Sequence, residues 1–163
     1  MTTNKQIHLI ARPDHEALVS HFQLVSSELP PLGPGQVLVR HHYLSLDPYM
    51  RGRMSEAKNS AAPQPLGATM LGGTAGEVLA SNSPAFAVGD SVVGMGGWQE
   101  YSVVDAAQPG ALRKVDARQI PLSAYLGAVG MPGVTAWYGL TQILEARAGQ
   151  TVLVSAATGA VGS

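Results

Sequence analysis

The sequence predicts a mainly β protein, in which a lobe of short strands is followed by the beginning of an α/β lobe. The chain of 163 residues contains 19 glycines and 11 prolines, and this composition favours short strands and turns over long helices. Five or six short apolar segments between turn signals are typical of a β-barrel or a sandwich. A short apolar run followed by a glycine-rich turn at residues 151–163 indicates where an α/β lobe begins.

The expected strands have apolar side chains that alternate with polar ones, or run continuously, between turn-forming residues. The longest covers residues 36–46, and the Asp47-Pro48 pair ends it. Glycines inside the segment at residues 70–80 indicate a bulge or a close approach of two backbones. The expected strands are residues 7–11, 21–25, 36–46, 70–80, 91–94 and 99–104.

Helical segments are expected at three places, and the second half of the chain holds two of them. A single turn is expected over residues 48–54, because proline is favoured in the first turn of a helix. Residues 55–69 are small, polar and rich in proline, so they predict a surface loop. Residues 122–129 predict a short helix, and helical spacing of apolar residues predicts a longer one over residues 132–146.

The last 13 residues carry the strongest local signal for a ligand. Val152 to Val154 has the apolar, β-branched character of a buried parallel strand, and the turn that follows contains Gly159 and Gly162. In dinucleotide-binding proteins such a turn lets the backbone approach a pyrophosphate, and the next helix points its free N–H groups at the phosphates. Because the chain ends at Ser163, the sequence predicts a nucleotide site that is begun here and not completed.

Composition excludes several classes of function. The net charge of −1 provides no general attraction to nucleic acid or to an anionic membrane. The absence of cysteine excludes disulfides, thiolate nucleophiles and cysteine-rich zinc sites. The N-terminus lacks the apolar region of a signal peptide, and no run of 18 apolar residues follows. These features predict a soluble cytoplasmic protein that binds neither nucleic acid nor membrane.

The histidines do not predict a metal site. A catalytic zinc needs about three protein ligands, usually histidine, cysteine or carboxylate. His41 and His42 are adjacent on an expected strand, so their side chains point to opposite faces and cannot share one ion. We therefore expect no metal in this chain.

Four segments together resemble one family. They are YLSLDPYMRGRM at residues 43–54, VGDSVVG at 88–94, GMPGVTAW at 130–137 and AATGAVGS at 156–163. The chain resembles the N-terminal portion of the zinc-independent branch of the medium-chain dehydrogenase/reductase superfamily. Within it, the similarity is to leukotriene B4 dehydrogenase/prostaglandin reductase-like enzymes and to bacterial curcumin or 2-alkenal reductases. Where zinc-dependent relatives carry a cysteine and a Gly-His-Glu segment, this sequence reads Leu-Ser-Leu-Asp at residues 44–47 and Gly-Gly-Thr at residues 72–74.

The resemblance implies a GroES-like β-barrel lobe over residues 1–125 and the first strand of a truncated Rossmann α/β lobe over residues 126–163. It also implies an oxidoreductase that uses NADPH to reduce the C=C bond of α,β-unsaturated ketones and aldehydes without a metal. The implied partner is a small-molecule enone or enal, and the full-length protein is a possible homodimer. Most of the Rossmann lobe would lie outside this chain, so we expect the 163 residues alone to be inactive.

Site residues follow from the same resemblance, with no catalytic residue among them. Tyr49 matches a family tyrosine that lines the substrate pocket, and the alternative is an ordinary barrel-edge tyrosine with a hydrated hydroxyl. Arg51 and Arg53 are interpreted as surface arginines rather than phosphate ligands. The residues that the resemblance assigns to the cofactor are Met131, Pro132, Thr135, Gly159, Ala160, Val161 and Gly162.

Simpler explanations stay open for the cofactor residues and for the function. Proline and threonine at residues 132 and 135 also suit plain helix initiation, and residues 159–162 also suit a plain turn. A quinone reductase of the same superfamily would use the same cofactor and differ only in substrate. A free-standing β-lobe that binds or scaffolds without catalysis is the remaining alternative.

Overall fold

The computed structural model describes residues 3–57 and 61–163, which divide into two compact units. The first unit is Met1–Val115 and the second is Asp116–Ser163. The domain boundary expected between residues 125 and 126 stays a prediction. Among the described residues, no helix has the length and the apolar character needed to cross a membrane.

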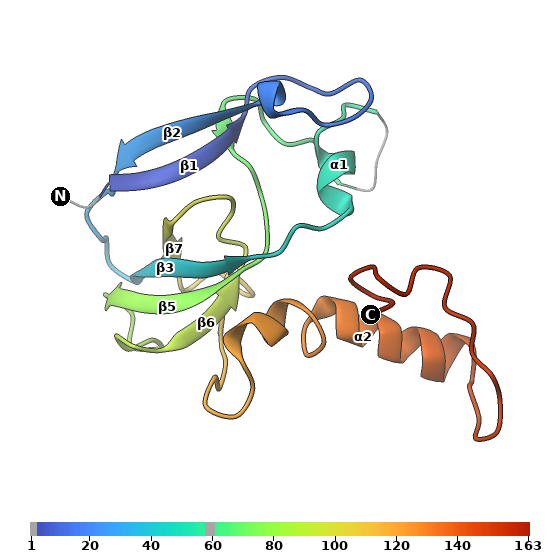
Figure 1. Ribbon diagram of the computed structural model, residues 1–163. Helices are drawn as coiled ribbons and strands as arrows, with labels where there is room; N and C mark the ends of the chain where they lie inside the picture. The colour runs from blue at the N-terminus through green and yellow to red at the C-terminus, as the bar shows by residue number, and fades with distance from the viewer. Residues whose placement is uncertain (1–2, 58–60) are drawn as a thin grey trace. The chain divides into compact units, whose positions relative to one another are not determined.

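All eight strands of the described chain lie in the first unit and pair antiparallel (Figure 1). A three-stranded sheet has the order β2-β1-β4, and a five-stranded sheet has the order β7-β3-β5-β6-β8. An isolated bridge pairs Gln6 of β1 with Gln99, which lies two residues before β7. The strands are β1 (Thr3–Leu9), β2 (Phe22–Glu28), β3 (Gln36–Leu44), β4 (Ala68–Thr69), β5 (Thr74–Ser81), β6 (Ser91–Gly94), β7 (Tyr101–Asp105) and β8 (Leu112–Lys114).

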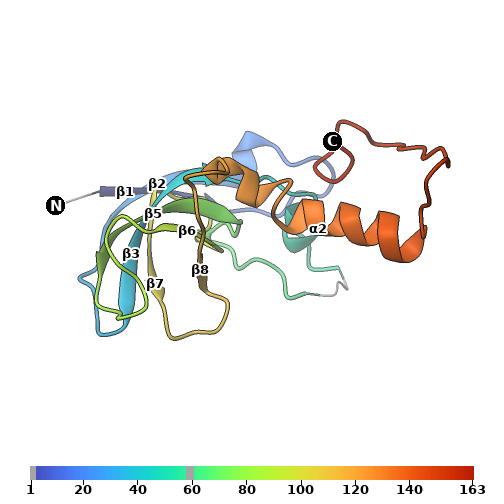
Figure 2. The ribbon, with the colours of Figure 1, turned by 90° about the horizontal axis from the view of Figure 1, so that it is seen from below.

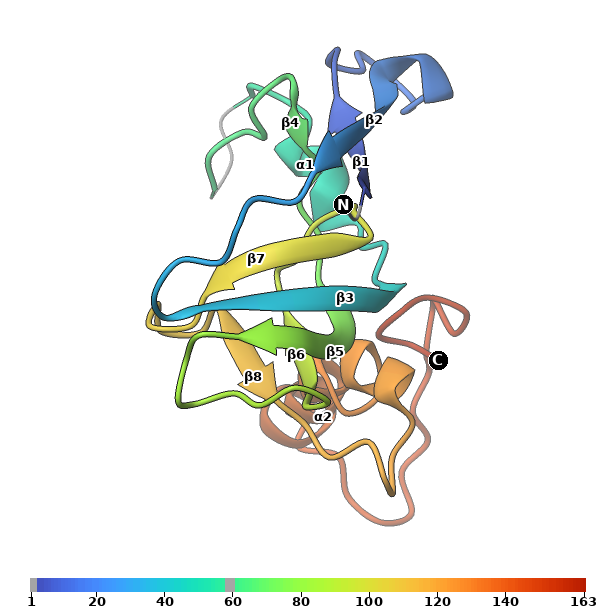
Figure 3. The ribbon, with the colours of Figure 1, turned by 90° about the vertical axis from the view of Figure 1, so that its left-hand side faces the viewer.

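The predicted mainly β fold class is confirmed. The five-stranded sheet curls along its length, as Figures 2 and 3 show, and β1 and β2 lie across from it in the same unit. The alternating pattern of β3 has its physical basis here. Val37 and Val39 point to one face of the sheet and are buried, whereas Arg40, the next residue, points to the other face and is exposed. The strand β8 was not predicted, since it has only three residues and none of them is fully buried.

Two apolar clusters form the core of the first unit. The first contains Leu9, Met50, Met54 and Met70, and Trp98 packs against it with its ring stacked on Phe22 at 5.4 Å between centroids. The second cluster lies within the five-stranded sheet and contains Val37, Val39, Val78 and Val92. Burial of each such side chain contributes about 1.5–3 kcal/mol to folding.

Gly76, in the segment at residues 70–80, shows the close approach of two backbones that the sequence predicted. A Cβ at Gly76 would collide with the carbonyl oxygen of Arg40 and lie 3.0 Å from the Cα of His41. The β3–β5 register shifts between His41 and Tyr43, which is the irregularity expected beside such a glycine. The two backbones approach so closely that only a residue without a side chain fits.

We expect the substitution Gly76→Ala to lower the free energy of unfolding by about 1–3 kcal/mol, because a methyl group would push β5 away from β3. The measurement is the urea midpoint followed by circular dichroism. The matched control is Gly33→Ala, whose added Cβ would meet only the movable side chain of Gln36 at 3.2 Å. Equal midpoints for the two variants would contradict the close approach.

The second unit is helical and irregular. It contains η2 (Leu122–Leu126), α2 (Met131–Tyr138) and the π-helical turn η3 (Gly139–Ile143). The helix predicted over residues 132–146 therefore begins at the expected place, but its α-helical part ends eight residues early, at Tyr138. After η3 the chain reverses through Glu145, which has a φ of 46°.

The strand predicted over Val152 to Val154 is wrong for this structure. These residues have no regular secondary structure, and Leu153 is 93% exposed. A parallel strand is stable only when neighbouring strands satisfy its backbone and helices cover its faces. All strands of the described chain belong to the first unit and pair antiparallel, so the second unit supplies no neighbour.

Candidate functional site

Tyr49 lies at the start of α1 (Tyr49–Arg53), the short helix that follows β3. Pro48 precedes the helix with helical backbone angles, and the amide of Met50 donates to the carbonyl of Asp47 at 3.0 Å. Proline fixes φ near the helical value, which explains why so short a helix forms at this place. The side chain of Met50 is 3% exposed and anchors α1 in the first apolar cluster, whereas Tyr49 is 38% exposed.

The hydroxyl of Tyr49 stays protonated at neutral pH. Partial burial is the main cause that raises the pKa of Tyr49 above its usual value of 10.0, and the negative charge of Asp47 adds to it. The positive charge of Arg53 acts in the opposite direction and is the smallest of the three effects. Among the described residues, the Tyr49 hydroxyl has no hydrogen-bond partner, so it is available as a donor to a ligand oxygen.

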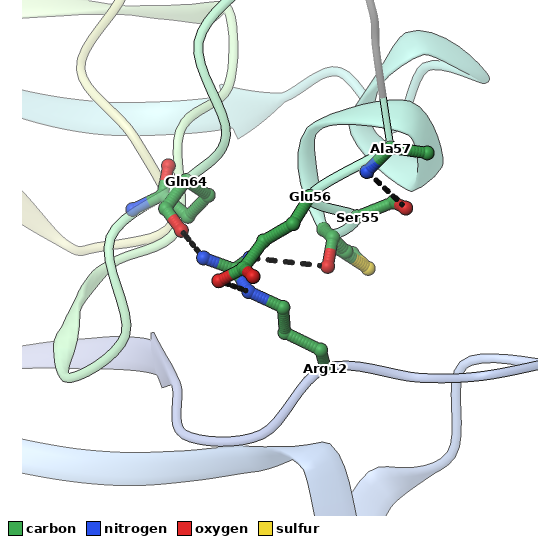
Figure 4. Close-up of polar contacts among 6 residues, drawn as sticks. Arg12, Ser55, Glu56, Ala57 and Gln64 are labelled. Atoms are coloured by element: carbon green, nitrogen blue, oxygen red, sulfur yellow. Dashed lines mark hydrogen bonds and ion pairs between the residues drawn. The ribbon is translucent and has the colours of Figure 1, made fainter.

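Arg12 fixes the C-terminal end of α1 from outside the helix (Figure 4). Its Nη1 donates to the carbonyl of Met54 at 3.2 Å, and its Nη2 donates to the carbonyl of Gln64 at 3.1 Å. Its Nε also donates to a carboxylate oxygen of Glu56 at 2.8 Å. One guanidinium therefore ties the segment after β1 to the helix and to the loop that follows it.

Arg51 makes the reciprocal contact. Its Nε and Nη2 donate to the carbonyl of His15 at 3.1 and 2.7 Å, and Nη2 also donates to the carbonyl of Pro13 at 2.9 Å. Arg51 is therefore a structural residue that holds α1 in place. These contacts join residues 36 to 52 positions apart, and no local sequence pattern indicates such pairs. The roles of Arg12 and Arg51 were therefore not predicted.

His41 lies in a small cavity inside the five-stranded sheet. The cavity has a volume of about 10 Å³, room for a single water, and its polar lining includes Thr74 and Ser102. The Nε2 of His41 lies 2.8 Å from the Ser102 hydroxyl, and its Nδ1 is buried without a partner among the described residues. Burial is the main cause that lowers the pKa of His41 to about 4, and the adjacent His42 adds to it.

The two adjacent histidines have different partners. His42 is exposed, and its Nε2 lies 3.7 Å from a carboxylate oxygen of Glu77 on β5, whereas His41 contacts Ser102 on β7. Within residues 3–57 and 61–163, no group of three or more histidine or acidic side chains is placed to hold a metal ion.

The cofactor residues predicted on α2 lie at its first two turns. Met131 and Thr135 are exposed, and Pro132 is buried at the second position of the helix. The Thr135 hydroxyl donates to the carbonyl of Met131 at 2.8 Å, so it does not cap the helix, and its oxygen remains free to accept. A Cβ at Gly133 would collide with the carbonyl of Ala128, which packs the helix start on the preceding turn.

Three amides of the glycine-rich turn donate to carbonyls within the turn. Gly159 donates to the carbonyl of Ala156 at 3.0 Å, and Gly162 and Ser163 donate to the carbonyl of Gly159 at 3.2 and 3.0 Å. Ala160 and Val161 are exposed at the tip of the turn. A phosphate-binding turn must present free N–H groups. Among the described residues, the amides of Ala160 and Val161 donate to no backbone carbonyl, whereas those of Gly159 and Gly162 are engaged within the turn.

Comparison with known proteins gives the same family that the four segments indicate. Residues 5–112 match a family model described as the N-terminal domain of oxidoreductase. The chain is 42% identical over 160 residues to the NADPH-dependent curcumin reductase of Escherichia coli, covering 98% of this chain and 46% of that protein. It is 44% identical over 136 residues to the NADP-dependent 2-alkenal reductase of Nicotiana tabacum, covering 81% of this chain and 38% of that protein.

A solved structure has the same fold over nearly the whole chain. The structure of CurA from Vibrio vulnificus in complex with NADPH matches with a TM-score of 0.88 and 43% identity, covering 97% of this chain and 46% of that one. The chain thus spans less than half the length of these relatives. With the family model matched over 108 residues of the first unit, the chain belongs to the family of oxidoreductase N-terminal domains, within the medium-chain dehydrogenase/reductase superfamily.

Proposed function

We propose that this chain supplies the substrate-binding lobe of an NADPH-dependent oxidoreductase that reduces the C=C bond of α,β-unsaturated ketones and aldehydes. The observation that carries the proposal is Tyr49, a protonated and half-exposed phenol without a polar partner among the described residues, held on a helix that two arginines fix. The substrate class is supported by two of the relatives named above, which are named as a curcumin reductase and a 2-alkenal reductase.

Tyr49 would bind the carbonyl oxygen of the substrate. When bound, NADPH supplies a hydride to the β-carbon of the enone, and negative charge then develops on the carbonyl oxygen. A phenol that donates a hydrogen bond to that oxygen stabilises the charge more in the transition state than in the ground state. The clamps from Arg12 and Arg51 keep the phenol in place before the substrate arrives, so little ordering is needed on binding.

The other cofactor contacts are proposals of the same kind. Exposed Met131 and the free acceptor oxygen of Thr135 suit a contact with the nicotinamide side of NADPH, next to buried Pro132. A pyrophosphate contact at residues 159–162 would use the amides of Ala160 and Val161, and it would need the turn to release those of Gly159 and Gly162 as part of a Rossmann lobe that would extend residues 126–163. We further propose zinc independence, a cytoplasmic location and pairing of full-length subunits as a homodimer.

The test is a turnover assay with the protein that carries this chain. We expect oxidation of NADPH, followed at its absorbance maximum, with an α,β-unsaturated ketone and not with the matching saturated ketone. Mass spectrometry and NMR of the product should show a reduced C=C bond and an intact carbonyl. Incubation with EDTA should leave the rate unchanged, because the proposal assigns no step to a metal.

Each alternative gives a different result in this assay. A quinone reductase would turn over a quinone and leave the enone unchanged. A β-lobe that only binds would oxidise no NADPH with either substrate. Loss of enone turnover after EDTA treatment, with recovery on adding zinc, would contradict the zinc-independent proposal.

A further inference from the structure

Three arginine side chains lie at or beside α1, and only two of them have acceptors. Arg12 donates to two carbonyls and one carboxylate, and Arg51 donates to two carbonyls, as described above. Arg53, the last residue of α1, makes no hydrogen bond or ion pair with its side chain among the described residues. Within residues 3–57 and 61–163, its polar contact with another segment is through its backbone carbonyl, which accepts from the amide of Gln64 at 2.7 Å.

The Nε atom of Arg53 is sealed from solvent without an acceptor. More than nine in ten buried polar groups in proteins have a partner, so an exception calls for a reason. A guanidinium stays charged at any physiological pH, and it cannot escape this cost by losing a proton. The rest of the side chain is only half-buried, so a group that approaches it from solvent can reach the charged end.

Arg53 follows Tyr49 by four residues on the same helix. Residues at this spacing are neighbours on one face of a helix. The two side chains are also coupled electrostatically, since the charge of Arg53 acts on the ionisation of the Tyr49 hydroxyl. The face of α1 that carries the proposed substrate contact therefore also carries an uncommitted positive charge.

The terminal nitrogens of an arginine can hold a carboxylate or a phosphate with two parallel hydrogen bonds, and in Arg53 it is these nitrogens, not the sealed Nε, that a ligand from solvent can reach. We propose that Arg53 binds a negatively charged oxygen group of a ligand that lies beside Tyr49. The group is a carboxylate on an acidic enone substrate or a phosphate of the dinucleotide, and the shared chemistry is a flat or tetrahedral oxyanion. The choice between these two sources rests on the proposed function, whereas the anion site itself does not.

The first test needs no enzymatic activity. The Nε–H resonances of the arginines are followed by NMR in the 163-residue chain while inorganic phosphate or acetate is added, with sodium chloride at equal ionic strength as the reference. We expect the Arg53 resonance to shift and saturate with phosphate or acetate. The Nε–H groups of Arg12 and Arg51 are internal controls, because their acceptors are already in place. An Arg53 resonance that responds only as these two do would overturn the proposal.

The second test uses the active protein and the variants Arg53→Gln and Arg53→Lys. If the anion is a substrate carboxylate, Arg53→Gln should raise KM for an acidic enone about 10- to 100-fold and change KM for its methyl ester less than about threefold. If the anion is a cofactor phosphate, the Kd for NADPH should rise by a similar factor, and both enones should be affected equally. Arg53→Lys should recover part of either loss, since it keeps the charge without the fork.

The control is Arg118→Gln, which removes an exposed arginine whose partner is Asp116. Unchanged KM for both enones together with unchanged Kd for NADPH in Arg53→Gln would overturn the proposal. A saturable NMR shift in a protein that reduces no enone would leave the anion site standing and would reject only the proposed function.

Discussion

Lowering the pH from 6.5 to about 4 is expected to reduce the free energy of unfolding, and protonation of His41 accounts for about 3 kcal/mol of that reduction at most. In the folded chain, burial keeps the pKa of His41 at about 4, against 6.5 when the histidine is exposed. Between these values the unfolded chain binds a proton that the folded chain does not bind. The neutral imidazole in its cavity therefore contributes fully above pH 6.5, and this contribution is lost as the pH falls through the window.

The measurement is a series of urea titrations between pH 7 and pH 4, with His41→Gln as the reference. The glutamine variant has no titrating group in the cavity, so its stability should fall less steeply over the window. The difference between the two curves isolates His41 from carboxylates that also titrate, such as Asp90 and Asp116, whose pKa values are lowered by Lys114 and Arg118.

An NMR titration of His41 in the folded, unmodified chain tests this prediction even if the His41→Gln variant does not fold. Its ring proton should keep the shift of a neutral imidazole down to about pH 4. A midpoint near 6.5 for this proton would contradict the burial argument, whatever the stability curves show.

Replacing Tyr49 by phenylalanine is expected to lower kcat for enone reduction about 10²-fold, with little change in the Kd for NADPH. The substitution keeps the aromatic ring at the first position of α1 and removes only the hydroxyl. The loss should therefore fall on the step in which negative charge develops on the substrate oxygen. Steady-state kinetics with the parent protein and an independent measurement of NADPH binding separate the two effects.

Tyr43→Phe is the matched control for this substitution. Tyr43 lies on β3, is 48% exposed and loses the same hydroxyl group in the variant. We expect its kinetics to match those of the unmodified protein. Enone kinetics that are unchanged in Tyr49→Phe would place Tyr49 among the packing residues of the barrel edge.

Local patterns in the sequence predicted most of the first unit. The alternation in β3, the apolar run of β6 and the glycines beside β5 each reflect contacts that the pattern itself determines, and the strands formed where these patterns occur. The pattern at Val152 to Val154 is just as apolar, yet no strand forms there. A strand depends on its neighbours, and a local pattern does not report whether they are present.

The candidate site was predictable only in part for a related reason. The Asp47-Pro48 pair and the resemblance of residues 43–54 identified Tyr49 and the helical turn that carries it. The interpretation of Arg51 as a surface residue missed its contacts with Pro13 and His15, because a charged residue that binds distant carbonyls looks the same in a sequence as a solvated one. The buried, unpartnered Nε of Arg53 was missed for the same reason, since its burial depends on the folded chain around it.

The bonds of Asn4 determine when this lobe can close during synthesis. Asn4 is 3% exposed, and its amide group donates to Gln99 and to the carbonyl of Tyr101 and accepts from the amide of Tyr101, all at 3.0 Å. These partners are translated 95 to 97 residues later. The β1–β2 hairpin can form early, but the polar side chain of Asn4 stays in water until β7 has left the ribosome. Closure of the two sheets is therefore a late, long-range event, even though the strand that it secures is the first to be made.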